Sequence, residues 1–288
     1  MARAHRDLAR NAPGDLFVDE SCIACDTCRR FAPETFGGDE DEVAFVQRQP
    51  SDPDERRRAL VALVSCPVAA IGSRSKVGVA EAAAALPEQI APGLFDCGYA
   101  ARSSFGAAAW LVQTSAGNVL VDSPRFTAPL LKRLVELGGV RWMFLTHRDD
   151  VADHARWHSA LGCDRVLHAR DVTGDTRSVE VKVQGDDPFA LADELLVVPV
   201  PGHTAGSSAL LVRDRLLFTG DHLWANAAGQ LDASRAVCWW DWDAQVRSMA
   251  RLADLEFEWV LPGHGRPWRA PSRSAARAAV RALAESMR

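Results

Sequence analysis

The feature of this sequence that most constrains its fold is a set of four strand-like apolar segments, each followed by a histidine or an aspartate. His147 comes directly after RWMFLT, and His203 follows LLVVPVPG. Asp221 follows RLLFTG, and His264 follows EWVLPG. Strands of two facing sheets end at a common edge, so loops that are distant in the sequence can meet there. Because imidazole and carboxylate groups together suit zinc or iron and suit magnesium poorly, we expect these loops to build a metal site.

The segments around these motifs alternate between strand-like and helix-like patterns from about Gly93 to the C-terminus. Amphipathic helices are expected where apolar residues recur at helical spacing, as before the Gly138-Gly139 stop. The expected strands are 107–114, 118–124, 141–146, 195–202, 208–213, 215–221 and 258–265, and the expected helices are 128–139, 243–255 and 274–287. This alternation predicts an α/β domain.

A second group of metal-capable side chains lies near the N-terminus. Cys22, Cys25 and Cys28 are each separated by two residues, and Cys66 precedes a proline much further along the chain. Three closely spaced thiolates can hold three corners of a cubane cluster, and the fourth iron then needs one ligand from elsewhere in the fold. The alternative is a structural zinc site, although such sites prefer paired C-x2-C motifs.

This cysteine spacing resembles that of bacterial ferredoxins, in which a fourth cysteine followed by proline comes shortly after the third. Ala32-Pro33 stand in that position in this chain. In two-cluster ferredoxins the local fourth cysteine serves the other cluster, so the resemblance implies a single [4Fe–4S] cluster. Its ligands would be Cys22, Cys25, Cys28 and Cys66.

The order of the strand-end motifs resembles that of the metallo-β-lactamase superfamily: a histidine-rich loop, then PGHT-x-GS, then TGD, then PGHG. The resemblance implies an αββα sandwich of the α/β class with one or two divalent metals, zinc or iron. It implies that Asp221 bridges two ions and that Asp153 and Asp221 belong to the catalytic centre. The ligands implied for one ion are His147, His203 and Asp221, and those for the other are Asp153, His154, His264 and the shared Asp221.

The first of these loops departs from the family pattern. The usual form is H-x-H-x-D-H, whereas this chain reads H-x-D-D-x-x-D-H, with Asp149 in the place of the second histidine and two residues added before Asp153. If Asp149 is a ligand, as a carboxylate is in the flavodiiron reductases of the same superfamily, the site prefers iron or manganese over zinc. Asp150 is open to two interpretations, a ligand or a cap of the following helix, on which it would share a face with His154 and His158.

Composition and cysteine position divide the chain into three parts. Residues 1–72 are expected to form a small α+β ferredoxin-like domain, the Ala-rich residues 73–92 a linker, and residues 93–288 the metallo-β-lactamase-fold domain. The net charge of −5 does not favour nucleic acid or an anionic membrane as a partner, and no apolar run approaches the ~20 residues of a membrane span. The N-terminus lacks a secretory pattern, and clustered cysteines fit metal binding in a reducing compartment, so we expect a cytoplasmic protein.

Two activities are consistent with these motifs. The first is a hydrolase of a small-molecule substrate that activates water at the metal site, with the cluster domain appended. The second is an oxidoreductase with non-haem iron at the same site, supplied with electrons through the cluster by an electron-transfer partner. A cluster-bearing sensor is a third interpretation. Because hydrolysis is the majority activity of the superfamily, we take it as the expectation.

The aromatic run Trp239-Trp240-Asp-Trp242 lies between the TGD and PGHG motifs. In one interpretation these side chains pack against the helix that follows. In the other they form an aromatic wall, either over the metal site or against the cluster domain.

Overall fold

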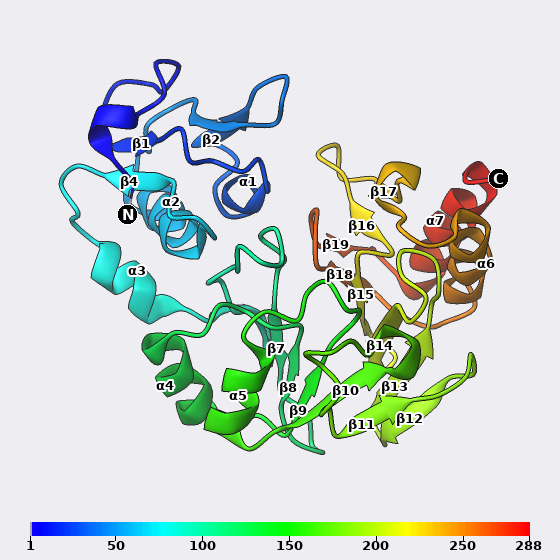
Figure 1. Ribbon diagram of the computed structural model, residues 1–288. Coiled ribbons are helices and arrows are strands. Elements are labelled where there is room, and N and C mark those ends of the chain that lie inside the picture. The colour runs from blue at the N-terminus through cyan, green and yellow to red at the C-terminus, as the bar shows by residue number, and fades with distance from the viewer. Residues whose placement is uncertain (1) are drawn as a thin grey trace. The chain divides into compact units, whose positions relative to one another are not determined.

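The structure is a computed structural model that describes residues 2–288, and these residues group into two units. The first unit comprises residues up to 111 together with 123–139 and 152–160, and the second comprises 112–122, 140–151 and 161–288. Among the described residues, no helix is long and apolar enough to cross a lipid bilayer. The arrangement of elements within each unit can be followed in Figure 1.

The first unit contains short antiparallel strand pairs and helices. Strand β1 (Leu16–Val18) pairs with β4 (Ile71–Ser73), and β2 (Phe36–Gly38) pairs with β3 (Ala44–Val46). Strand β5 (Glu88–Ala91) pairs with β6 (Leu94–Asp96). The helices are η1 (Ala4–Arg6), α1 (Thr27–Phe31), α2 (Pro53–Ser65), α3 (Val79–Ala85), α4 (Ala128–Glu136) and α5 (His154–Leu161). Strand β7 (Trp110–Val112) crosses the border between the units.

Helix α2 illustrates how the sequence fixes these elements. The Asp52 carboxylate accepts the N–H groups of Asp54 and Glu55, and Pro53 occupies the first helical position. Such an N-cap is worth about 1 kcal/mol. The helix buries residues 59–62 and ends at Ser65, so that Cys66 follows directly at its C-cap.

The second unit contains four parallel strands and a six-stranded sheet. The parallel strands are β8 (Val119–Val121), β9 (Trp142–Phe144), β10 (Asp164–His168) and β11 (Val181–Val183), in that spatial order. The six-stranded sheet has the order β12 (Phe189–Ala192), β13 (Leu195–Pro199), β14 (Ser208–Val212), β15 (Leu216–Gly220), β18 (Trp259–Pro262) and β19 (Trp268–Arg269). The remaining elements are η2 (Ala169–Asp171), β16 (Trp224–Ala225), β17 (Leu231–Asp232), η3 (Arg235–Val237), α6 (Trp242–Leu252) and α7 (Arg273–Ser286).

Helices α6 and α7 lie side by side and pack on the six-stranded sheet (Figure 1). Their N-termini are capped by Asp241 and Ser272, whose side chains accept the N–H groups of Ala244 and Ala275. The buried core beneath them joins Met249 of α6 to apolar side chains of the sheet. This packing covers one face of the sheet and leaves the strand ends to the loops.

The strand directions bring three of the histidine- and aspartate-bearing loops to one edge. Strands β13 and β15 are both antiparallel to β14, so they run in the same direction, and β18 is parallel to β15. The loops after β13, β15 and β18 therefore leave from the same side of the sheet. The loop after β9 joins them, because the N–H of Ser208 donates to the carbonyl of Thr146 at 2.8 Å.

The elements expected from the sequence around the motifs are confirmed. Strands β7 to β9, β13 to β15 and β18 and helix α4 form within the expected ranges, and helices α6 and α7 each begin one residue before theirs. The other ends coincide with the expected bounds or lie up to several residues inside them. The segment expected to connect the domains, residues 73–92, contains α3 and all of β5. Helix α5 begins at His154, so the interpretation of Asp150 as a helical residue that shares a face with His154 and His158 is wrong.

Candidate metal centre and cysteine site

Five side chains of the second unit meet where the loops after β9, β13 and β15 converge. The Nε2 atoms of His147 and His203 lie 3.7 and 3.8 Å from Oδ2 of Asp221. Oδ2 of Asp149 lies 3.4 Å from Nε2 of His203 and 4.0 Å from Nε2 of His147. Oδ2 of Asp150 lies 3.9 Å from Nε2 of His147. Two imidazoles and three carboxylates thus surround one small volume.

Backbone and side-chain acceptors orient the two imidazoles. Nδ1 of His203 lies 2.6 Å from the carbonyl oxygen of Val237, which can only accept, so this nitrogen carries the proton. Nδ1 of His147 lies 2.9 Å from the hydroxyl oxygen of Thr146. In both rings Nε2 is buried and has no hydrogen-bond partner within the described chain. Each ring therefore turns an Nε2 atom without a protein partner towards the carboxylates, the position of a metal-binding nitrogen.

A buried carboxylate stands behind His147. The Thr146 hydroxyl lies 2.9 and 3.0 Å from the two oxygens of Asp122, and the N–H of Thr146 donates to the same carboxylate at 2.8 Å. Since the hydroxyl has one proton and gives it to Asp122, its oxygen accepts the Nδ1–H of His147. Burial raises the pKa of Asp122 to about 7. Burial also lowers the pKa of His147 to about 4, so its imidazole is neutral at pH 7.

His264, from the loop after β18, contacts Asp221. Its Nδ1 lies 2.8 and 2.9 Å from the two carboxylate oxygens. Burial tends to raise the pKa of Asp221, but the neighbouring His264, His147 and His203 outweigh it and hold that pKa well below its usual range. Asp221 is therefore the ionised carboxylate at the middle of the group.

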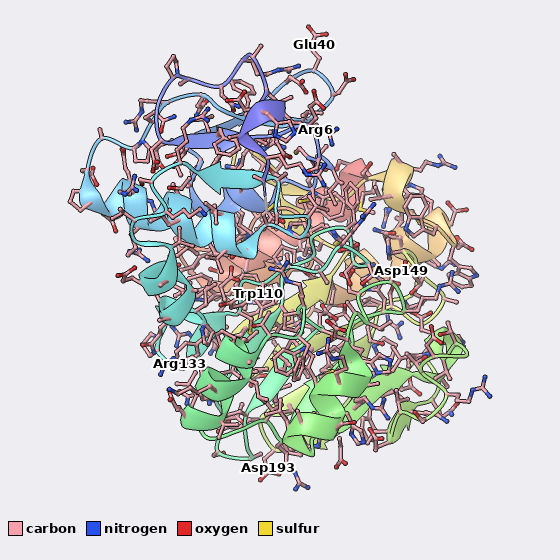
Figure 2. The ribbon with its side chains drawn as sticks, turned by 60° about the vertical axis from the view of Figure 1, so that its left-hand side comes forward. Arg6, Glu40, Trp110, Arg133, Asp149 and Asp193 are labelled. Carbon is pink, nitrogen blue, oxygen red and sulfur yellow. The ribbon has the colours of Figure 1, made fainter. Side chains whose placement is uncertain are left out.

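The other two carboxylates differ in burial. The side chain of Asp149 is 45% exposed, and its proximity to His203 lowers its pKa. It is labelled in Figure 2. Asp150 is fully buried, and burial together with the nearby Asp221 raises its pKa well above the ordinary value. Oδ2 of Asp150 has no hydrogen-bond donor in the described chain. Two buried carboxylates side by side need a compensating cation.

The donor atoms fit a metal ion by chemistry and by spacing. Two groups of three, His147 with Asp149 and His203, and His147 with Asp150 and Asp221, each place their ligand atoms within 4.8 Å of one another. Ligand bonds of about 2.0–2.2 Å in a tetrahedral site put neighbouring donors roughly 3.3–3.6 Å apart, close to the measured separations.

Glycine at position 263 makes room for this arrangement. A Cβ atom there would lie 2.9 Å from Oδ2 of Asp150 and 2.9 Å from Oδ1 of Asp221. The PGHG motif therefore brings the backbone against both carboxylates, an approach that only a residue without a side chain allows.

The candidate metal ligands expected from the sequence can now be compared with the positions of their side chains in the structure. His147, Asp149, His203 and Asp221 lie together, and His264 contacts Asp221. Asp153 and His154 belong to neither group of candidate ligands found in residues 2–288. The Asp153 carboxylate accepts the N–H of Phe126 at 2.8 Å. Ligation by Asp153 and His154 and the catalytic role given to Asp153 stay predictions.

Sequence reasoning missed the groups that support the site. Asp122 and Thr146 had a signal, because each follows an apolar strand, but the Val237 carbonyl had none. Asp171 was also missed: this buried carboxylate accepts the N–H of Arg148 at 3.0 Å and of Gly206 at 2.8 Å, and so ties the loops after β9 and β13 together.

The four N-terminal cysteines line one cavity of the first unit. Cys22, Cys25, Cys28 and Cys66 surround it together with apolar side chains such as Val18 and Ile71. Burial raises the pKa of the Cys25 and Cys28 thiols, and the proximity of the other cysteines raises both further. A metal cluster that binds all four as thiolates removes this repulsion.

Backbone N–H groups point at the sulfur atoms. Ala24 and Ala44 donate to Sγ of Cys22 at 3.5 and 3.4 Å, and Ala70 donates to Sγ of Cys66 at 3.3 Å. Such donors stabilise negative charge on cluster sulfurs. Four convergent thiols with amide donors around them fit a [4Fe–4S] cluster.

A loop far along the chain closes this site. The hydroxyl of Thr27 donates to the carbonyl of Gly106 at 3.0 Å and lies 3.3 Å from Sγ of Cys25. Gly106 has a φ of +90°, and a Cβ atom there would lie 2.8 Å from both Cβ and Sγ of Cys25. The site therefore depends on a glycine that lies 79 residues from Thr27.

Comparison with protein-family models finds two matches. The model of the 4Fe-4S single cluster domain of Ferredoxin I matches residues 18–73. The model of the metallo-beta-lactamase superfamily matches residues 93–284. Both resemblances inferred from the sequence are thereby confirmed.

Individual relatives are more distant. A hydroxyacylglutathione hydrolase of Cereibacter sphaeroides is 33% identical over 151 residues, which cover 50% of this chain and 56% of that protein. The crystal structure of DIM-1 metallo-beta-lactamase is 18% identical, with a TM-score of 0.53, and covers 70% of this chain and 97% of that one. A crystal structure of TTHA1623 in a di-iron-bound form is 24% identical, with a TM-score of 0.45, and covers 57% and 89%. The likeness to DIM-1 shows the fold and confirms the expected α/β class.

Proposed function

The chain belongs to the metallo-β-lactamase superfamily and carries a single-cluster [4Fe–4S] domain, and we propose that it is a metal-dependent hydrolase of a small-molecule substrate. The observation that carries this proposal is the meeting of His147, His203 and Asp221 from three separate loops, with both Nε2 atoms left without a hydrogen-bond partner in the described chain. A divalent ion held there lowers the pKa of a bound water towards neutrality and polarises a carbonyl or phosphoryl oxygen.

The chain's own residues set the conditions for this chemistry. Thr146 and Val237 orient the rings of His147 and His203, so that both Nε2 atoms face Asp221. Asp221 remains ionised beside them and is oriented by His264. The exposed edge of Asp149 leaves a side of the group open to substrate.

The similarity to a hydroxyacylglutathione hydrolase supports hydrolysis, although the matched region covers 56% of that relative. The substrate of that relative is not transferred to this chain. In the hydrolytic proposal the cluster has a structural or regulatory role, because hydrolysis needs no electrons.

The position of Asp149 favours a second candidate function. With His147 and His203 it forms a set of two imidazoles and one carboxylate, a donor set typical of non-haem iron. If iron is bound there and the cluster supplies electrons from a partner protein, the chain is an oxidoreductase.

Metal analysis and turnover separate the two candidates. The anaerobically purified protein is expected to contain about four cluster irons and four sulfides, and the site metal is counted separately. Hydrolysis that proceeds equally with the cluster oxidised or reduced supports the hydrolase. Iron at the site together with turnover that requires a reductant would overturn it in favour of the oxidoreductase.

A further inference from the structure

A short segment between η3 and α6 is tied to the loop that carries His203. The N–H of Trp239 donates to the carbonyl of His203 at 3.0 Å, and the N–H of Asp241 donates to that of Gly202 at 3.1 Å. The thiol of Cys238 donates to the Gly202 carbonyl at 3.1 Å. Together with the bond from His203 Nδ1 to the Val237 carbonyl, these contacts fix residues 237–241 against one candidate ligand.

Three side chains of this fixed segment are apolar and exposed. Val237 is 36% exposed, Trp239 63% and Trp240 50%. Burying a tryptophan is normally favourable, and exposed apolar patches commonly mark ligand-binding surfaces. Three such residues within four positions form what we call the tryptophan patch, residues Val237, Trp239 and Trp240.

The tryptophan patch lies beside the candidate metal centre. The Trp239 ring centroid is 6.1 Å from that of His203, with the two planes tilted by 60°. The His203 ring in turn lies 4.7 Å from the His147 ring. Asp149, the exposed carboxylate of the centre, approaches His203 at Nε2. A tryptophan with a fixed backbone therefore neighbours the ligand whose Nε2 faces the carboxylates.

We propose that Trp239 is a specificity-determining residue and that the tryptophan patch binds an aromatic ring of the substrate. An exposed indole on a fixed backbone offers a flat face for offset stacking, and tryptophan has only two side-chain torsions to order. This inference rests on the proposed function, because it assigns the substrate class of the same site. Packing against α6 does not account for Trp239 and Trp240, because both side chains are about half exposed or more. Binding of a substrate ring gives these two residues a role.

Binding of two simple metal-directed probes tests the inference without knowledge of the substrate. Benzohydroxamate and acetohydroxamate share the same metal-binding group and differ in an aromatic ring. Their Kd values are measured by calorimetry on the full-length holoprotein under anaerobic conditions, with the cluster absorption recorded before and after. The preference is the Kd of acetohydroxamate divided by that of benzohydroxamate.

Trp239→Ala is expected to reduce this preference by about 3- to 10-fold, the usual range for one aromatic stacking contact. Trp239→Phe keeps a ring and is expected to retain most of the preference. Phe189→Ala, which removes an apolar side chain that is 41% exposed on β12, is the matched control and is expected to leave the preference unchanged.

The outcomes distinguish this inference from the proposed function. If both probes bind and the preference is the same in Trp239→Ala as in the wild type, the role of Trp239 is overturned and the hydrolase proposal stands. If neither probe binds to protein that retains its cluster and its site metal, both are overturned, because no substrate group reaches the metal.

Discussion

Replacing Thr146 by valine isolates the contribution of the buried group behind His147. Valine has nearly the shape of threonine but lacks the hydroxyl that joins Asp122 to Nδ1 of His147. Without it, the Nδ1–H of a side chain that is only 1% exposed loses its acceptor, and the imidazole is free to take the tautomer with a proton on Nε2. In that tautomer Nε2, the atom that faces the site, cannot bind a metal ion.

The expected effect has two parts. Leaving a buried donor without a partner costs about 1–3 kcal/mol of the free energy of unfolding. Loss of a group that orients a metal-binding histidine typically weakens metal affinity about 10- to 100-fold, or about 1.4–2.7 kcal/mol. Thr146→Ser keeps the hydroxyl and is expected to retain most of the affinity.

A competition titration against a chelator measures the metal affinity, and chemical denaturation measures the free energy of unfolding. Thr176→Val is the matched control, because Thr176 is equally buried and its hydroxyl contacts a nearby residue, the N–H and the hydroxyl of Thr173. Both valine variants are expected to lose stability, but only Thr146→Val is expected to lose metal affinity. Equal affinities for the two variants would refute the proposed orientation of His147.

Three further changes probe other parts of the structure. Gly263→Ala places a Cβ atom 2.9 Å from two carboxylate oxygens; we expect loss of site metal with the cluster retained, and normal metal content would show that the close approach is not needed. Gly106→Ala adds about 1–2 kcal/mol of backbone strain at φ +90° and a clash with Cys25; loss of the cluster absorption is expected, and an intact cluster would contradict the packing. Burial lowers the pKa of His222 to about 3. Below pH 6.5 the unfolded chain therefore binds a proton at this histidine that the folded protein binds only near pH 3. The free energy of unfolding falls as the pH drops towards 3. This loss is about 2 kcal/mol between pH 7.5 and 5. Denaturation curves of His222→Phe should lack this pH-dependent loss of stability. An unchanged pH dependence would show that His222 is not the source of the loss.

The convergence of the strand-end motifs could be predicted because it follows from strand direction. The apolar runs before His203, Asp221 and His264 form parallel-running strands, and their C-terminal ends share an edge. The cysteine site could also be predicted, because three closely spaced cysteines require a fourth ligand from elsewhere in the chain. In the structure Cys66 lines the same cavity as the other three.

The details of the first loop could not be predicted, because its two added residues leave open from the sequence which aspartates face the site. Asp150 lies with His147 and Asp221, where Gly263 leaves space for its carboxylate. Asp153 instead accepts a backbone N–H from Phe126. Contacts between remote backbone groups, such as Val237 with His203 or Gly106 with Thr27, have no signature in the residues themselves. The domain bounds at 72 and 93 stay a prediction.

The central claim is that side chains from remote loops hold a metal ion, and anomalous scattering from crystals of the holoprotein tests it most directly. Maps collected above and below the iron and zinc absorption edges should place a peak about 2.0–2.2 Å from Nε2 of both His147 and His203. A map with no peak there, in crystals whose cysteine-bound cluster is clearly visible, would contradict the account.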